Sequence, residues 1–330
     1  MAADPMKRPS FPVLGLAILF VAASPTSAAI QAKPAGSIAV TRALKSADFL
    51  TAKIALDRLV DPSINPASVE KQVARLADEA RKIAGPRASE GAKIDAVRKV
   101  IYQAGPWNDF RPFSYDQADP FGQDIRNKLL STYLRTRRGN CISMPALFLI
   151  VGRRIGLNLT LTTAPLHVLV RYTRPGIHPF NIESTSGGSF ARDAWYRQKF
   201  PMSDRSIQSG VYLRTHTDKQ TIALMAHTVV EYLVSAGRNE EAISSADAIL
   251  AINPRDAHTL TKKGTAIAEL MKGEFFDKYP TPDLVPVHLR LRYAELARTN
   301  ARAFADAEAL GWEETSLENQ SVNKASVKTP

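Results

Sequence analysis

Residues 138–157, RGNCISMPALFLIVGRRIGL, decide the fold, because a short polar loop leads there into an apolar helix. Residues 146–151 are all apolar, a pattern typical of a helix buried on every side. Pro145 is tolerated only in a first helical turn, since proline lacks an N–H. The helix is therefore predicted to begin at residues 142–144. This places Cys141, the single cysteine of the chain, at or just before its first residue.

Beyond Gly156 the period of the pattern changes to two, as expected for strands. Leucines alternate with polar residues over 157–162, and two further strands are predicted at 166–173 and 177–185, joined by a turn at 174–176. Helical patterns precede this region at 46–60, 66–84, 89–104 and 123–137, with an aromatic-rich loop at 105–122 and Gly139 as the stop of the last helix. A buried helix that feeds an antiparallel sheet predicts an α+β core.

The C-terminal third is predicted to be helical from residue 217. Residues 223–254 resemble one tetratricopeptide unit, with Gly237 in the turn and Pro254 at the end. A second unit begins at Ala257, and Gly264 follows Val230 by the 34 residues of the repeat period. The match is partial, so the expectation is an all-α domain of helical hairpins that follows the α+β core.

The N-terminus has the pattern of an export signal. Lys7 and Arg8 precede the apolar run of residues 13–23, and small residues up to Ala29 suit cleavage. The run is shorter than the ~20 residues of a membrane-spanning helix, so no transmembrane segment is expected in the mature chain. The expected division is a signal peptide (1–29), an α+β core domain (30–205), a helical domain (206–313) and a disordered tail (314–330). A periplasmic or secreted protein is therefore expected.

The formal charge of the chain is +11, and removing Lys7, Arg8 and Asp4 with the signal leaves +10. A basic exported protein is attracted to acidic cell-envelope surfaces. Nucleic acid is not expected as a partner, because the basic residues are spread along the chain without an aromatic-basic stacking motif. The hairpins provide a second expected interaction surface, for a protein partner.

An unpaired cysteine in an exported protein has three interpretations. Cys141 is buried and inert, or pairs with another molecule, or is kept as a reactive thiol. The residues that follow favour the last, because His167 lies in the second predicted strand and Glu183 in the third. Nucleophile, base and orienting group follow in that order, as a thiol active site requires.

The position of Cys141 favours thiol chemistry. The attacking species is a thiolate, and the positive end of a helix, with Arg137 and Arg138 nearby, lowers the pKa of a thiol. The backbone N–H of Cys141 is the natural first donor to an oxyanion. The sequence does not identify a second donor.

The hairpin register restricts the third member of the site. If the turn is centred on Pro175, His167 faces Glu183; a shift of the centre by one residue brings Asn181 or Thr185 opposite instead. Glu183 is the first choice, because a carboxylate fixes the imidazole tautomer and stabilises the imidazolium. Asn181 is the alternative. No metal or other cofactor is expected: His178 with the other three candidates lacks the close ligand pairing of zinc motifs.

Over roughly residues 44–189 the chain resembles the bacterial transglutaminase-like family of the papain-like thiol-enzyme superfamily. The resemblance rests on three segments: residues 138–157, residues 165–171 (PLHVLVR) and residues 181–188 (NIESTSGG). It implies a cysteine nucleophile, a histidine base and an acidic third member, which correspond to Cys141, His167 and Glu183. It also implies a hydrolase or acyltransferase acting on a protein or peptide substrate, without implying cross-linking.

Two departures from the family stand out. The third member in the family is usually aspartate, and His178-Pro179-Phe180-Asn181 stands where some relatives have Asp-Pro-Phe-Asn.

Some relatives also lack the cysteine, so the fold alone does not imply catalysis. The rival hypothesis is therefore a non-catalytic scaffold that binds protein or peptide partners through its helical repeats. A weaker third hypothesis is a redox thiol that dimerises through Cys141.

Overall fold

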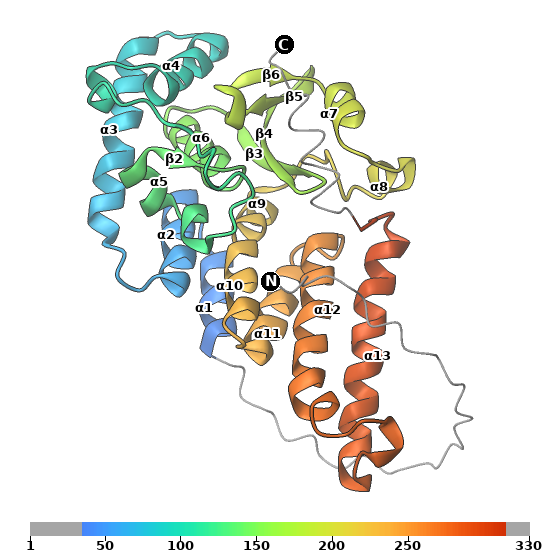
Figure 1. Cartoon of the computed structure of the whole chain (residues 1–330). Coiled ribbons are helices and arrows are strands. Elements are labelled where there is room, and N and C mark those ends of the chain that lie inside the picture. Colours follow the sequence, from blue (N-terminus) through green and yellow to red (C-terminus); the bar gives the residue numbers. More distant parts are fainter. Residues whose placement is uncertain (1–34, 315–330) are drawn as a thin grey trace. The chain divides into compact units, whose positions relative to one another are not determined.

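The computed structural model describes residues 35–314; the expected signal peptide (1–29) and residues 315–330 of the expected tail lie outside them. Mostly helical elements precede the cysteine-bearing helix (Figure 1). They are α1 (Ala35–Leu44), α2 (Phe49–Val60), α3 (Pro66–Ala84), α4 (Glu90–Tyr102), η1 (Pro106–Asn108), β1 (Ser114–Tyr115), η2 (Ile125–Lys128), α5 (Leu130–Thr136) and β2 (Arg138–Gly139).

Side-chain caps set the starts of the early helices. Asn65 accepts the N–H of Ser68 and Pro66 occupies the first turn, so the predicted helix over 66–84 is confirmed. The helix predicted from residue 46 begins instead at Phe49, because Asp48 accepts the N–H of Thr51 as its cap. Helix α1 and the short strands β1 and β2 were not predicted from the sequence.

The single helix predicted over 123–137 is wrong, since η2 and α5 replace it and the backbone is extended at Leu129. The break has a tertiary cause. The N–H of Leu130 donates to the buried carboxylate of Asp57 at 2.8 Å, so α5 starts on a side chain from α2. Asp57 also accepts from Lys53 at 2.7 Å, and both side chains are almost fully buried.

Gly139 does not end the preceding helix, although a glycine directly after the helical pattern suggested that it would. The left-handed residue that ends α5 is Arg137, with φ 63°. Gly139 lies in β2, and a Cβ at this position would stand 2.6 Å from the Tyr133 ring and 2.7 Å from Ser143 Oγ. A glycine is therefore needed here for close packing between α5 and the start of the cysteine-bearing helix, and not for its backbone freedom.

A four-stranded antiparallel sheet follows α6 in the order β3-β4-β5-β6 and confirms the predicted antiparallel arrangement. Helix α6 packs against β3 and β4 on one side, while buried residues after β6 form a separate cluster with Leu169 of β4. The fourth strand was not predicted. The elements are α6 (Ser143–Arg154), β3 (Leu159–Ala164), β4 (His167–Arg174), β5 (Ile177–Glu183), η3 (Ser184–Ser186), β6 (Ser189–Ala191), α7 (Asp193–Lys199) and α8 (Asp204–Gln208).

The C-terminal part consists of helices that pack on their sequence neighbours, with α10 against α11, α11 against α12 and α12 against α13. Gly237 makes the turn between α10 and α11 with φ 68°. Assignment of these hairpins to a tetratricopeptide repeat stays a prediction. The elements are α9 (Asp218–Met225), α10 (His227–Ser235), α11 (Asn239–Leu250), α12 (Ala257–Met271), the π-helical turn η4 (Lys272–Phe276), η5 (Pro282–Leu284) and α13 (Val287–Ala309).

The main hydrophobic core runs across the expected domain boundary at residues 205/206. It contains buried side chains of α1–α6 and the sheet together with those of α9–α11, such as Ile222, Val229 and Ile249. A smaller cluster joins α12 to α13. The first C-terminal helices therefore share their core with the cysteine-bearing part of the chain.

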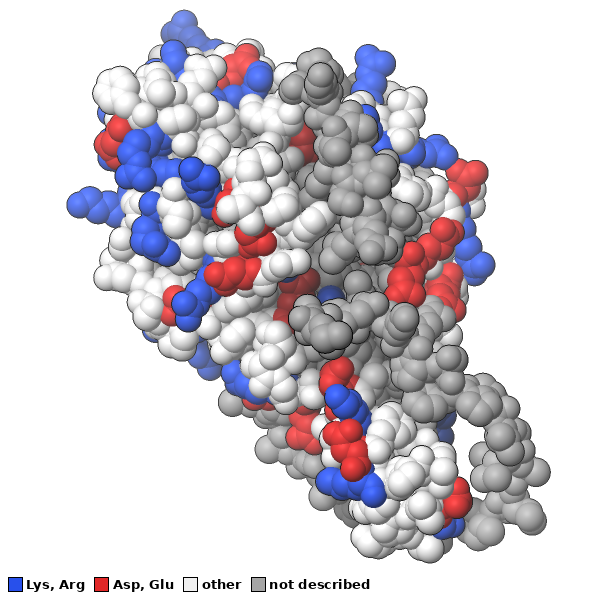
Figure 2. All heavy atoms as spheres, viewed as in Figure 1, with Lys and Arg blue, Asp and Glu red and all other residues white. Residues whose placement is uncertain are grey.

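Lysine and arginine side chains are scattered over the face shown in Figure 2, interspersed with acidic groups. Within residues 35–314, no helix combines the length and the hydropathy that a membrane span needs.

Candidate functional site

Cys141 lies two residues before α6, and 8% of its surface is exposed. Asn140 builds the entry to this helix: its Oδ1 accepts from the N–H groups of Ile142 and Ser143, at 3.0 and 3.2 Å. In return Ser143 Oγ accepts from the Asn140 N–H at 3.2 Å. The predicted helix start is confirmed. The cap also means that the two amides after Cys141 already have an acceptor.

Replacing Asn140 by alanine is expected to lower the free energy of unfolding by about 1–2 kcal/mol, the usual value of a lost helix cap. It also frees the segment that holds Cys141, so alkylation of the thiol should change. Asn65, which caps α3, provides the matched control. Urea unfolding should show comparable losses for both alanine variants, while the alkylation rate should change only for Asn140→Ala. Equal alkylation rates in both would contradict this role of Asn140.

The thiol of Cys141 faces the start of β4. Its Sγ lies 3.8 Å from the Leu166 carbonyl oxygen, and the thiol is close enough to the His167 imidazole to raise the pKa of that ring. Leu166 has φ 52°, a left-handed conformation that is costly for leucine, and 46% of it is exposed. This strained residue turns the carbonyl toward the sulfur directly before the histidine.

The other nitrogen of His167 is engaged by Glu183. His167 Nε2 lies 2.7 Å from Glu183 Oε2, and only 9% and 7% of the two side chains are exposed. Nδ1 is therefore the ring nitrogen left for the thiol. Phe200 stacks on the imidazole with ring centroids 5.5 Å apart and an interplanar angle of 13°. The ring is thus fixed in its plane by stacking and in its rotation by the carboxylate.

Four hydrogen bonds reach the Glu183 carboxylate. Oε2 also accepts from the Tyr196 hydroxyl at 2.8 Å, and Oε1 accepts from the N–H and the hydroxyl of Thr185 at 3.0 and 2.6 Å. Burial opposes ionisation, but the His167 charge and these donors outweigh it and lower the pKa of Glu183. Burial likewise opposes protonation of His167, yet Glu183 and Cys141 raise the pKa of the imidazole.

The hairpin adopts one of the two shifted registers that the sequence left open, and not the one centred on Pro175; the predicted His167–Glu183 pair nevertheless forms. Arg171 faces Asn181 and Val170 faces Ile182, so the turn is centred one residue beyond Pro175, with an irregularity between residues 172 and 174. Continuing this ladder would bring Thr185, not Glu183, opposite His167. Glu183 reaches the imidazole as a diagonal neighbour, because a long side chain spans that separation.

Asn181, the alternative third member, takes part in a different network. Its Oδ1 accepts from Arg171 at 2.8 Å and its Nδ2 donates to Asp193 at 2.7 Å. Arg171 and Asp193 also form a two-bond ion pair at 2.7 and 3.1 Å. Asn181 therefore helps to fasten α7 to the sheet, and within residues 35–314 its side chain forms no hydrogen bond with His167.

Helix α7 contributes site residues that were not predicted from the sequence. Asp193, Tyr196 and Phe200 are spaced by three and four positions, so one face of this short helix and its cap covers β4 and β5. That spacing was the available signal, but nothing in it indicated which strands the face would cover.

Tyr115 also lies beside the site, although it belongs to the aromatic-rich loop of residues 105–122, to which no role in the site was assigned from the sequence. Burial, and then the charges of Cys141 and Glu183, raise its pKa above the ordinary tyrosine value, so the phenol stays protonated beside the site. Its hydroxyl donates to the carbonyl of Pro120. Tyr115 pairs with Gly139 in the short β1–β2 ladder, which brings the loop of residues 114–122 next to the cysteine segment.

The four residues considered for zinc do not converge. His178 is exposed near the start of β5, and Glu183 ends that strand. Five strand positions correspond to about 16 Å, far beyond a shared coordination sphere. Within residues 35–314, no group of three or more His, Cys, Asp or Glu residues has an arrangement suited to a metal ion.

Comparison with known proteins supports a transglutaminase-like domain in one part of this chain. A model of the transglutaminase-like superfamily matches residues 67–205, which include Cys141, His167 and Glu183. The UPF0162 protein YchA of Escherichia coli K12 is 26% identical over 146 residues, 43% of this chain and 53% of that protein. A UPF0162 protein of Vibrio cholerae is 24% identical over 229 residues, 68% of this chain and 80% of that protein. The match thus spans about half the length of the E. coli protein. No solved structure matches this chain.

Proposed function

We propose that this chain is an exported thiol enzyme that cleaves or transfers an amide or peptide acyl group through Cys141, His167 and Glu183. The observation that carries the proposal is the buried His167–Glu183 pair, at 2.7 Å, beside a thiol that stands at the entry of α6 and raises the pKa of the imidazole. A raised histidine pKa beside a cysteine favours the thiolate–imidazolium form, in which the nucleophile is already deprotonated.

The proposed reaction has two acyl-transfer steps. The Cys141 thiolate attacks the amide carbon, the oxyanion accepts from the Cys141 N–H, and His167 Nδ1 gives its proton to the leaving amine. Water or an amine then attacks the thioester, its proton passes to His167, and the thiolate leaves. Glu183 keeps the proton on Nε2 and stabilises the imidazolium. Because Asn140 takes the amides of Ile142 and Ser143, a second oxyanion donor comes from outside this turn.

Trapping the thioester tests the proposal. The chain is incubated with an ester donor and a glutaminyl-peptide donor, and intact-mass spectrometry follows an acyl adduct that hydroxylamine removes. We expect the adduct on Cys141, none in Cys141→Ala and a strongly reduced rate in His167→Ala. His178→Ala is the matched control, because it removes an exposed histidine and should leave the rate unchanged. An adduct that persists in Cys141→Ala would contradict the proposal.

The scaffold alternative has its own supporting observation. Val287 and Leu291 lie one turn apart on α13 and are 78% and 80% exposed, an apolar pair suited to a protein partner. Deleting the C-terminal helices would disturb the shared core, so the sharper variant is Val287→Glu with Leu291→Glu. Loss of function in this double variant, with normal function in Cys141→Ala, would favour the scaffold.

Export to the periplasm or medium is proposed from residues 1–29 and is tested separately. N-terminal sequencing of the mature protein should begin after Ala28 or Ala29. A chain that keeps Met1 or Met6 at its N-terminus would contradict export by a cleaved signal.

A further inference from the structure

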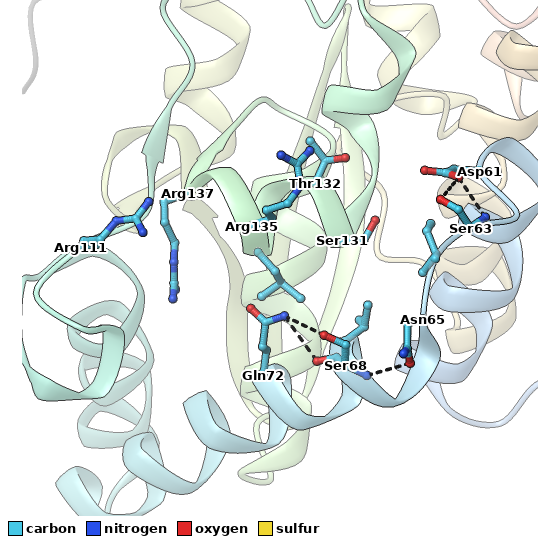
Figure 3. A pocket seen from close by; sticks show the side chains of 13 residues that line it. Asp61, Ser63, Asn65, Ser68, Gln72, Arg111, Ser131, Thr132, Arg135 and Arg137 are labelled. Carbon is cyan, nitrogen blue, oxygen red and sulfur yellow. Dashed lines mark hydrogen bonds between the residues drawn. The ribbon is translucent and has the colours of Figure 1, made fainter.

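A cavity rich in arginine lies away from Cys141 (Figure 3). Its volume is about 490 Å³, within the range of small-ligand sites, and it opens to solvent. Three arginines and one aspartate line it, with hydroxyl and amide groups from α3 and α5. None of Cys141, His167 and Glu183 contributes to the lining, so this cavity is separate from the proposed active site.

Arg137 is the key side chain of this cavity. Its guanidinium lies 4.2 Å from the centre of the Phe113 ring, and 17% of the side chain is exposed. The nearest carboxylate oxygen, on Asp109, is 3.7 Å away, and Asp109 already binds Arg75 through two hydrogen bonds. Burial lowers the pKa of Arg137, and neighbouring Arg111 acts in the same direction. The half-buried charge is thus only partly compensated by the protein.

The charges of the other two arginines are compensated even less than that of Arg137. Arg111 and Arg135 are exposed, and neither forms an ion pair or side-chain hydrogen bond with another described residue. The one lining carboxylate, Asp61, accepts two hydrogen bonds from Ser63 at 3.0 and 2.6 Å. The lining therefore has an excess of two positive charges, and Arg137 is held in place by stacking on Phe113 and by a 3.7 Å ion pair with Asp109, a carboxylate that it shares with Arg75.

We propose that the Arg111–Arg135–Arg137 cavity binds a phosphate group. Planar guanidinium forks match phosphate oxygens in pairs, and several of them favour an anion with more than one charge. Thr132 and Ser68 add hydroxyl groups, and the positive end of α3 lies at the same cavity. The phosphate belongs either to a small phosphorylated molecule or to a phospholipid head group, since both present the same oxygens.

Titration calorimetry of the full chain at low salt tests the small-molecule source, with inorganic phosphate and pyrophosphate as probes. Flotation with phosphatidylcholine vesicles, with and without phosphatidylglycerol, tests the lipid source. Arg137→Gln and Arg111→Gln should each weaken binding about tenfold or more. Arg138→Gln is the matched control, because it removes the same charge from an adjacent exposed residue outside the lining.

Two outcomes support the site: arginine-dependent binding of pyrophosphate identifies a small-molecule ligand, and arginine-dependent binding of the anionic vesicles alone identifies a lipid head group. Arg111→Gln keeps the test valid if Arg137→Gln folds poorly, since Arg111 is exposed and unpaired among the described residues. Absence of binding to all probes would overturn the proposal. An equal loss in Arg138→Gln would also overturn it, because the binding would then follow net charge alone.

Discussion

Replacing Glu183 by alanine should lower the free energy of unfolding by about 3–5 kcal/mol near pH 6, the range for removing one partner of a buried ion pair. The variant leaves His167 buried without its counter-charge, and the Tyr196 hydroxyl loses the acceptor that it has at 2.8 Å. Two hydrogen bonds from Thr185 are lost as well. Urea unfolding followed by circular dichroism measures the change.

The size of this effect should depend on pH in a defined direction. The pKa of Glu183 is lowered in the fold, so its contribution is present above ~4.3 and is lost as pH falls below that value. The pKa of His167 is raised, so its contribution is complete below ~6.5 and is lost as pH rises toward the folded value. The difference between the wild-type chain and Glu183→Ala is therefore largest between ~4.3 and ~6.5.

Two milder variants control for cavity formation and for single bonds. Glu183→Gln keeps the volume and removes the charge, so it should be less destabilised than the alanine variant but lose the same pH dependence. Tyr196→Phe removes one of the four hydrogen bonds and should cost about 1 kcal/mol. A Glu183→Ala loss below that of Tyr196→Phe, or one independent of pH, would contradict the ion pair.

Asp57→Ala should also cost about 3–5 kcal/mol, because it strands the fully buried ammonium of Lys53. Lys53 keeps only a 3.3 Å hydrogen bond to the Lys128 carbonyl. The same change removes the acceptor for the Leu130 N–H, so the start of α5 should loosen. Thermal or urea unfolding gives the stability, and hydrogen exchange at Leu130 reports the local effect.

Asp78 provides the matched control for Asp57. It pairs with Arg81 at 2.6 Å on the surface of α3, with both side chains more than half exposed. Asp78→Ala should change stability little, because exposed ion pairs contribute weakly. Similar losses for Asp57→Ala and Asp78→Ala would show that burial does not strengthen the Lys53–Asp57 pair.

Local signals in the sequence predicted the parts of the fold that depend on neighbouring residues. Pro66 and Pro145 located two helix starts, and the period-two pattern located β3–β5. The Cys141, His167 and Glu183 segments were predicted to converge, and the structure brings these three side chains together.

The features that depend on distant contacts were missed. The sequence left three hairpin registers open, and alternation does not reveal the irregularity near Tyr172 that accompanies the observed one. The break before α5 depends on Asp57, 73 positions earlier in the chain. Tyr196 and Phe200 lie beside His167 because α7 folds back over the sheet, and a short helical spacing alone does not specify that target.

The pH dependence of Cys141 alkylation tests the central claim most directly. The rate of iodoacetamide modification is followed by mass spectrometry on the folded chain, with His167→Ala and the control His178→Ala measured alongside. An activated thiol predicts half-maximal reactivity well below ~8.5, an upward shift in His167→Ala and no shift in His178→Ala. A wild-type midpoint at or above ~8.5, or the same midpoint in His167→Ala, would contradict the proposed thiol enzyme.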